Sequence, residues 1–408
     1  MTLPEQLSLQ DIRIFQEQSR ICIGNAGGFT ANLSLKTLLS GRPECKRFIS
    51  IQAFFYTSTE LVILRLKMII MDLNSTDKRT IYWDDGIIMV DQTMLPARYE
   101  NIKITTIEEL CNAILKLKVR GAPALGAAGA FGVALAACKS DAHDLDALKS
   151  KVKDAAKSII STRPTAINLF LGVDTILKAI EPCATIEEVK EVAVEEAKRT
   201  ADEDIITNKA LSAVGASILN DGDVVMTYCN AGRLATVGWG TALGVIRSAT
   251  RSGKRISVYV CETRPLNQGS RITAFEMLED EIPATLIADN MAALTMKEDK
   301  VNCVIVGADR ITKEVVYNKV GTYMLAICAK HHGIPFYVAA PLSTCDFQDR
   351  EIEIEQRDPS ELIYCGKKQL APKSVKVENP AFDATPLELV TKIITENGIK
   401  NPFELMRR

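Results

Sequence analysis

Residues 223–341 alternate short apolar runs with helical stretches, and this alternation limits the fold more than any other feature. The runs are DVVMTYC, RISVYVCE, ATLIAD, CVIVGAD and PFYVAAP. Short runs rich in Val and Ile, with little polar alternation, are typical of strands buried on both faces of a parallel sheet. Because right-handed crossovers join such strands, the pattern predicts a doubly wound, Rossmann-like α/β domain over residues 216–408.

The preceding region, residues 71–215, has a different pattern. The segment RTIYWDDGIIMVDQTMLP predicts a β-hairpin that turns at Asp85-Gly86. Helical periodicity follows from residue 105, where a threonine and acidic residues form a favourable helix start. The stretch APALGAAGAFGVALAA predicts a small-residue helix that is tightly packed. We therefore expect a domain made of a small antiparallel sheet and a helical block.

Residues 1–70 contain no recognisable motif, and clear strand and turn signals begin only after Met71. We expect the working protein to start near Met71, so that residues 1–70 are an extension outside the family pattern. The alternative is a genuine N-terminal extension with little order.

The charge and cysteine content exclude several classes of function. The formal net charge is −2 and no long block of one sign is present, so nothing favours nucleic-acid binding. The apolar stretch LVILRLKMII is too short and too charged to span a bilayer, and we expect no membrane association. Eleven scattered cysteines without metal-site spacing indicate reduced thiols in the cytoplasm. We expect no metal and no cofactor.

Polar residues follow the predicted strands at the points where these strands end. Cys229 follows the first run, Gln268 lies beyond the second, Asp289 follows the third and Asp309 follows the fourth. Because the carboxyl ends of parallel strands share one edge of a sheet, we expect a small polar ligand to bind there.

The same region lacks the motifs of several common ligand sites. In GWGTALG the third glycine falls one residue late for a dinucleotide fingerprint. Gly238, Gly240 and Gly244 are therefore expected to allow close helix packing, and a dehydrogenase is disfavoured. The adjacent His331 and His332 end a helical stretch and are expected at the surface.

Three places could bind phosphate. Arg120 and Gly121 precede the small-residue helix, Arg163 precedes Pro164, and Asn318 with Lys319 precede a helix expected over about 320–331. Free N–H groups at a helix start, together with a guanidinium, form an anion site. Alternatively, each arginine caps a neighbouring carbonyl or pairs with a surface carboxylate.

Several motifs resemble those of the methylthioribose-1-phosphate isomerase family. They include VRGAPALGAAGAFG, YCNAGRLATVGWGTALG, ETRPLNQGSRITAFEM, VIVGADRI and NKVGTYMLAICAKHHGIPFYVAAPLSTCD, and the likeness runs from about Asp72 to Arg408. The family belongs to a superfamily that includes regulatory subunits of the initiation-factor exchange complex. The resemblance implies an aldose–ketose isomerase of methionine salvage that converts S-methyl-5-thioribose 1-phosphate into S-methyl-5-thioribulose 1-phosphate. It also implies a homodimer.

Site residues follow from the resemblance position by position. It implies catalytic roles for Cys229 and Asp309. It implies substrate contacts at seven further positions: Arg120, Gly121, Ala122, Arg163, Gln268, Asn318 and Lys319. The sequence departs from the family pattern at Tyr228, where a histidine is common, and at Arg233, where a smaller residue is expected. The segment between GADRI and NK is also about one residue short.

The implied reaction needs a group that is an acid at neutral pH, because the anomeric oxygen carries phosphate and the ring cannot open by the usual hemiacetal route. Asp309 follows an apolar run, so burial could raise its pKa enough for this role. Cys229 could be a second acid/base or could stabilise the transition state. The hydrogen could move from C2 to C1 through an enediol or as a hydride. The alternatives for the whole protein are an isomerase of 5-deoxyribose 1-phosphate or ribose 1,5-bisphosphate, and a non-catalytic regulatory subunit.

Overall fold

The computed structural model describes residues 78–347 and 354–406, so the expectations for residues 1–70 lie outside the described residues. The described chain begins with a three-stranded antiparallel sheet of β1 (Ile81–Trp83), β2 (Ile87–Val90) and β3 (Asn101–Ile104). Trp83 pairs with Ile87, and Asp85 and Gly86 have φ angles of 45° and 138° in the reversal between them. The predicted hairpin and its turn are confirmed, and β3 extends it by one strand.

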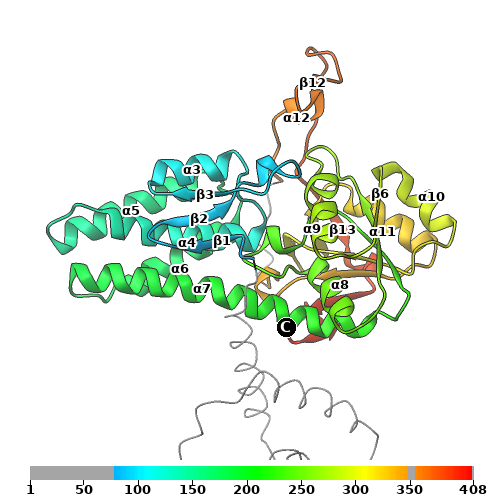
Figure 1. The fold of residues 1–408 in the computed structure, drawn as a ribbon, viewed down its shortest axis with the longest axis horizontal. Helices are drawn as coiled ribbons and strands as arrows, with labels where there is room; N and C mark the ends of the chain where they lie inside the picture. The colour runs from blue at the N-terminus through cyan, green and yellow to red at the C-terminus, as the bar shows by residue number, and fades with distance from the viewer. Residues whose placement is uncertain (1–77, 348–353, 407–408) are drawn as a thin grey trace, which may run out of the picture. The chain divides into compact units, whose positions relative to one another are not determined.

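Five helices follow this sheet and form a block with its own apolar core (Figure 1). They are α3 (Ile107–Leu115), α4 (Ala122–Lys139), α5 (Leu145–Ser161), α6 (Ile167–Ile180) and α7 (Ile186–Gly215). The expected start of α3 is confirmed, because Thr106 and Glu109 exchange side-chain-to-backbone hydrogen bonds in a capping box. The helix α7 ends where the second predicted domain begins, and it also contacts α8 and β14 beyond that boundary.

Helix α4 lies at the centre of this block. Its mean hydropathy of 1.4 makes it, among the described helices, long and apolar enough to cross a bilayer, yet 67% of it is buried inside the protein. It packs against α5, α6 and α7. Burial on most sides explains its apolar, small-residue composition.

The contact between α4 and α6 depends on glycine. A Cβ atom added to Gly172 would lie 1.9 Å from the carbonyl oxygen of Gly126. Because this oxygen belongs to a helix backbone, we expect Gly172→Ala to separate the helices and lower the free energy of unfolding by about 2 kcal/mol. Chemical denaturation would measure this loss. Lys178→Ala, at an exposed position of α6, is the control and should change stability by a few tenths of a kcal/mol at most.

A seven-stranded sheet forms the rest of the fold. The strand order is β15-β14-β10-β7-β4-β5-β6, and every neighbouring pair except β14 and β15 is parallel. The strands are β4 (Val224–Thr227), β5 (Ser257–Cys261), β6 (Ala284–Ile287), β7 (Cys303–Val306), β10 (Phe336–Ala339), β14 (Lys392–Thr395) and β15 (Gly398–Lys400). All five predicted strands are present, and β14 and β15 were not predicted.

Helices cover both faces of this sheet, which confirms the predicted doubly wound class. Helix α8 (Ala242–Arg251) packs on one face with the end of α7, around Val225, Val258 and Ile305. Helices α10 (Ala292–Lys297) and α11 (Thr322–His331) pack on the other, around Val304 and Val306. Side chains on opposite faces of β7 therefore pack into two separate hydrophobic cores.

Smaller elements complete the described chain. They are α9 (Ala274–Glu279), α12 (Ser360–Ile363), α13 (Pro402–Leu405), the hairpin β11 (Tyr364–Cys365) with β12 (Lys368–Gln369), and an antiparallel sheet of β8 (Arg310–Ile311), β9 (Val315–Lys319) and β13 (Phe382–Pro386). In Figure 1, α12 and β12 project at the top, beyond the neighbouring helices and strands. The sheet β13-β9-β8 was not predicted, and it places Asn318 and Lys319 at the end of a strand.

The glycines of GWGTALG serve packing, as expected. A Cβ atom on Gly244 would lie 2.3 Å from the Ser212 hydroxyl, and Gly240 has a φ of 88° against the backbone of Gly232. His331 is exposed at the end of α11, and His332 is the C-terminal cap residue.

Candidate active site

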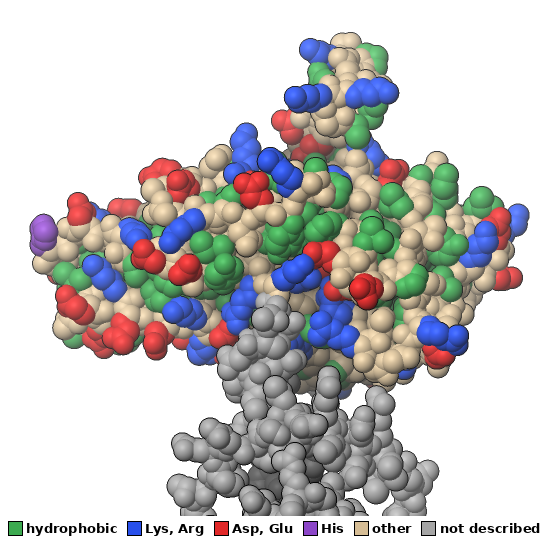
Figure 2. All heavy atoms as spheres, in the orientation of Figure 1, with side chains coloured by type: hydrophobic (Ala, Val, Ile, Leu, Met, Phe, Trp, Pro, Cys, Tyr) green, Lys and Arg blue, Asp and Glu red, His purple; other side chains and the backbone are tan. Residues whose placement is uncertain are grey.

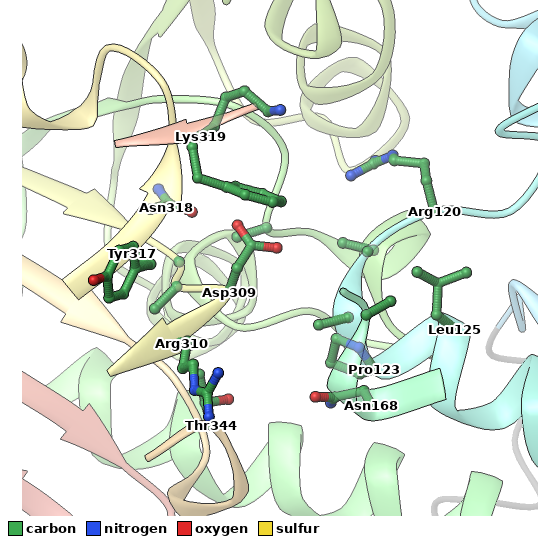
Figure 3. A pocket seen from close by; sticks show the side chains of 18 of the residues that line it. Arg120, Pro123, Leu125, Asn168, Asp309, Arg310, Tyr317, Asn318, Lys319 and Thr344 are labelled. Carbon is green, nitrogen blue, oxygen red and sulfur yellow. The ribbon is translucent and has the colours of Figure 1, made fainter. Parts of the chain in front are cut away.

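The nine residues predicted as catalytic or substrate-binding all line one cavity of about 230 Å³. Figure 3 labels four of them, Arg120, Asp309, Asn318 and Lys319. Asp289, which also follows a predicted strand, is not among the lining residues. The cavity lies where the carboxyl ends of β4 and β7 face the first residues of α4 and α6. The helical block and the large sheet thus each contribute one side. Convergence from elements this far apart in sequence makes the cavity the candidate active site.

Cys229 lies just beyond β4 and is held by hydrogen bonds on both sides of its backbone. Its N–H donates to the Thr263 hydroxyl at 2.8 Å, and its carbonyl accepts from the Thr273 hydroxyl at 2.6 Å. The residue has a φ of 62°, in the left-handed region that side chains other than glycine seldom adopt. The hydrogen bonds to these two threonines stabilise a backbone conformation that is otherwise unfavourable for Cys229.

Asp309 lies just beyond β7, on the neighbouring strand of the sheet. Its backbone N–H donates to the carbonyl of Tyr317 at 2.9 Å, which joins the end of β7 to β9. In Figure 3 its carboxyl points into the open space between Lys319 and Arg120. The group is therefore free to reach a ligand.

Burial raises the pKa of both candidate catalytic groups. For Asp309 the loss of solvation outweighs the opposing charges of Lys319, Arg163 and Arg120, so the pKa of its carboxyl lies above the ordinary value. For Cys229 burial likewise outweighs Lys319 and Arg120 and raises the thiol pKa. The cavity thus favours a carboxylic acid and a neutral thiol, both of which are proton donors.

Of the cations that line the cavity, three act on the charge of Asp309, and protein atoms hold each of the three. Arg120 donates to Gln92 Oε1 at 2.9 Å and to both the backbone and side-chain oxygens of Asn230. Arg163 pairs with Glu355 at 2.7 Å. Lys319 is buried, donates to the carbonyl of Ala381 at 2.8 Å and lies 5.0 Å from the Phe382 ring centre. The two arginines therefore line the cavity, as predicted. They also make the contacts of the alternative prediction, Arg120 with a backbone carbonyl and Arg163 with a carboxylate.

The helix starts differ in their ability to bind an anion. Neither α4 nor α6 has a side chain capping its first turn, and residues of both first turns line the cavity. At α11, by contrast, the Asp383 carboxylate accepts from the N–H groups of Gly321 and Tyr323. Asn318 and Lys319 precede α11 (Thr322–His331) as predicted, but Asp383 already occupies the anion position at the start of this helix. A ligand phosphate would find free helix N–H groups at α4 and α6.

Gln268 adds an unused acceptor. Its side chain is buried and lines the cavity, and among the described residues its Oε1 has no hydrogen-bond partner. An unpartnered buried amide oxygen is costly unless a ligand supplies a donor. A hydroxyl group of a sugar would satisfy it.

The sequence did not single out Glu276, although it organises the loop after Cys229. Its fully buried carboxylate accepts from Asn230 Nδ2 at 3.0 Å, Arg233 N at 2.8 Å, Leu234 N at 3.1 Å and Arg247 at 3.2 Å. Burial alone would raise its pKa, but Arg233 and Arg247 keep it lowered. Glu276 lies within the motif ETRPLNQGSRITAFEM, but nothing in that motif indicates which groups its carboxylate would bind.

Asn230 connects this carboxylate to the cavity, because the same side chain also accepts from Arg120. Glu276→Gln would place an N–H₂ group against N–H donors. We expect a loss of about 3 kcal/mol in the free energy of unfolding, together with weaker binding of a ligand at Arg120. Calorimetric melting would measure the first effect, and ligand titration the second. Glu279→Gln, which removes only the ion pair to Arg233 and Lys78, should weaken ligand binding less than Glu276→Gln.

Two further observations concern predicted features. Arg233, which departs from the family pattern, is buried, pairs with Glu279 and is not among the residues that line the cavity. Within residues 78–347 and 354–406, no three His, Cys, Asp or Glu side chains lie close enough together to hold a metal ion.

The chain is similar to known proteins over most of its length. The model of the Initiation factor 2 subunit family matches residues 118–402. A methylthioribose-1-phosphate isomerase of Heliobacterium modesticaldum is 50% identical and covers 79% of this chain and 96% of its own.

Two solved structures share the fold. The 5-methylthioribose 1-phosphate isomerase of Pyrococcus horikoshii has 41% identity and a TM-score of 0.76, covering 82% of this chain and 95% of its own. A structure from A. fulgidus described as translation initiation factor eIF-2B, subunit delta, has 55% identity and a TM-score of 0.74, covering 80% and 97%.

Proposed function

This chain belongs to the Initiation factor 2 subunit family, and we propose that it is a methylthioribose-1-phosphate isomerase of methionine salvage. The observation that supports this most strongly is the position of Asp309 and Cys229 at adjacent strand ends of one cavity. Cations and free helix starts for a phosphate line the same cavity, as does an acceptor for a hydroxyl. The choice of substrate is based on the names of the similar isomerases from Heliobacterium modesticaldum and Pyrococcus horikoshii.

The reaction needs a proton donor first. In our proposal the protonated Asp309 gives its proton to the ring oxygen, and the bond between that oxygen and C1 breaks with its electrons staying on oxygen. Electron density from the phosphate ester oxygen stabilises the cation left at C1. Asp309 is then a carboxylate and can act as a base.

Hydrogen then moves from C2 to C1 by one of two routes. In the enediol route a base removes the C2 proton, its electrons form a C1=C2 bond, and a proton returns to C1. In the hydride route the C2 hydrogen moves to C1 with its electron pair. In both routes the C2 hydroxyl loses its proton and C2 becomes the ketone carbon. Cys229 assists as a neutral thiol that donates to the developing oxygen charge.

A non-catalytic regulatory subunit is the second candidate, because the A. fulgidus neighbour at 55% identity is described as an eIF-2B subunit. A regulatory subunit that binds a sugar phosphate needs the cations of the cavity. It has no use for a buried carboxylic acid and a strained cysteine at the same place. The two candidates therefore differ in turnover, not in binding.

The deciding experiment is turnover of purified full-length protein in deuterated water. S-methyl-5-thioribose 1-phosphate, 5-deoxyribose 1-phosphate and ribose 1,5-bisphosphate would be compared, with product analysis by NMR. We expect fastest turnover of the first. Deuterium at C1 would indicate the enediol route, and its absence a hydride shift or a shielded proton. Binding of all three without turnover would favour the regulatory subunit.

We also propose that the protein is a cytoplasmic homodimer. Exposed apolar side chains gather near the β6 edge of the large sheet, and Figure 2 shows hydrophobic side chains over β6 and α10. The set is Leu278, Leu286, Met291, Leu294, Tyr323, Met324 and Ile327. Light scattering should give twice the chain mass, and Leu294→Glu should shift it toward the monomer. An unchanged mass in this variant would place the interface elsewhere.

A further inference from the structure

A second cavity adjoins the candidate active site. It has a volume of about 550 Å³. Arg120, Gln268, Leu117 and Leu266 line both cavities and form the wall between them. The remainder of the second cavity comes from elements that the proposed reaction does not use.

Three cations line only this second cavity: Lys116, Arg264 and Arg271. Arg271 donates to the carbonyls of Gln92, Leu95 and Leu266, and Arg264 to those of Pro265 and Glu361. Within the described residues, no carboxylate forms an ion pair with any of the three side chains.

The acidic groups nearby are already engaged. Glu361 lines the cavity, but its carboxylate pairs with Arg357 at 2.6 Å. The Asp289 carboxylate accepts from the backbone N–H groups of Thr263 and Arg264. Arg271 is held by backbone carbonyls and by no carboxylate among the described residues, and burial lowers the pKa of its guanidinium. The cavity therefore carries an excess of positive charge.

The other walls indicate more than a bare ion. Leu117, Pro265, Leu266, Ile272 and Tyr364 line the cavity, so apolar surface faces the same space as the cations. Guanidinium groups suit the oxygens of phosphate, and an aromatic ring beside apolar side chains suits an organic group attached to it.

We propose that this second cavity binds an organic phosphomonoester distinct from the sugar phosphate. Its phosphate lies among Lys116, Arg264 and Arg271, and its organic part against Tyr364 and Leu117. Because Arg120 and Gln268 separate the two cavities, a ligand in one changes the affinity of the other, and the effect is reciprocal.

Calorimetric titration of the full-length protein with phenyl phosphate and with inorganic phosphate tests this proposal. Phenyl phosphate should bind at two sites. Arg163→Met, which alters only the first cavity, should abolish one site and retain the other. Lys116→Glu and Arg271→Met should each weaken the retained site at least about tenfold, since each removes a direct phosphate contact. Lys116 is exposed and pairs with no acidic residue in the described part of the chain, so Lys116→Glu remains informative if Arg271→Met fails to fold.

Three results would overturn the proposal. One is a single phosphate site that disappears with Arg163→Met. Another is a second site that survives both Lys116→Glu and Arg271→Met. The third is equal affinity of the second site for phenyl phosphate and inorganic phosphate, which would mean that the cavity does not recognise an organic group. All of these are binding measurements, so an absence of isomerase turnover would leave them interpretable.

Discussion

Asp309→Asn should lower kcat for isomerisation about 10⁴-fold while leaving the affinity for the sugar phosphate nearly unchanged. The amide keeps the size and hydrogen-bonding oxygen of the side chain but cannot donate a proton to the ring oxygen. Binding depends on the cations and helix starts, which remain in place. Steady-state kinetics combined with direct ligand titration would separate the two effects. A similar loss of affinity and kcat would mean that Asp309 binds substrate and does not donate the proton.

The same substitution should have the opposite effect on stability. The Asp309 pKa is raised in the folded chain, so the carboxyl costs nothing at a pH below its unfolded value of about 3.8. As the pH rises toward and through the raised pKa, the folded chain must either keep Asp309 protonated or bury its negative charge. Both cost free energy relative to the unfolded chain, so the free energy of unfolding falls. Asp309→Asn removes this cost. We expect it to unfold at a higher temperature than the unaltered protein near pH 8 and at the same temperature near pH 3.

Activity of the unaltered protein should follow the same titration. If the protonated carboxyl is the acid, kcat falls as the pH rises through the raised pKa of Asp309, so that this limb lies above the ordinary aspartate pKa. Asp309→Glu keeps a proton donor and should retain part of the activity with a displaced limb. A pH profile that is identical in both proteins would assign the limb to another group, such as the substrate phosphate.

Five strands of the large sheet could be predicted because each one is recognisable from its own short stretch of sequence. β4, β5, β6, β7 and β10 are short apolar runs, each followed by polar residues. For the inner strands β4, β7 and β10, burial on both faces requires this composition. The strands β8, β9 and β13 are less apolar, and β13 pairs with β9 across more than 60 residues, as Asp383 does with Asn318. Their pairing depends on tertiary contacts that no local pattern contains.

The cavity could be predicted residue by residue only through family resemblance, but the strand-end argument already located its edge. It could not identify the supporting groups. Glu276 is one acidic residue among many in the sequence, and only the fold brings four N–H donors to it. Asp383 likewise occupies the start of α11 from a distant strand. Groups that act through another residue leave no spacing rule in the chain.

Cys229 provides the second large effect. Cys229→Ser should lower kcat about 10³-fold, because a serine hydroxyl is a far weaker acid than a thiol and cannot share a proton with the reacting oxygen. Cys345→Ser is the matched control, since Cys345 is a free thiol that lines the same cavity and has a pKa raised to about 12. We expect it to lose less than about tenfold in kcat. Equal losses in the two variants would mean that thiols support the cavity's packing only.

The backbone at Cys229 allows a sharper test of the same role. With a φ of 62°, a side chain at this position is strained, and glycine would relieve the strain. Cys229→Gly should therefore unfold at a temperature no lower than Cys229→Ser, while both are equally inactive. Because Thr263 and Thr273 bind backbone atoms, the loop keeps its hydrogen bonds in either variant. A fold that is stabilised by losing its cysteine would show that the strained thiol is maintained for chemistry and not for structure.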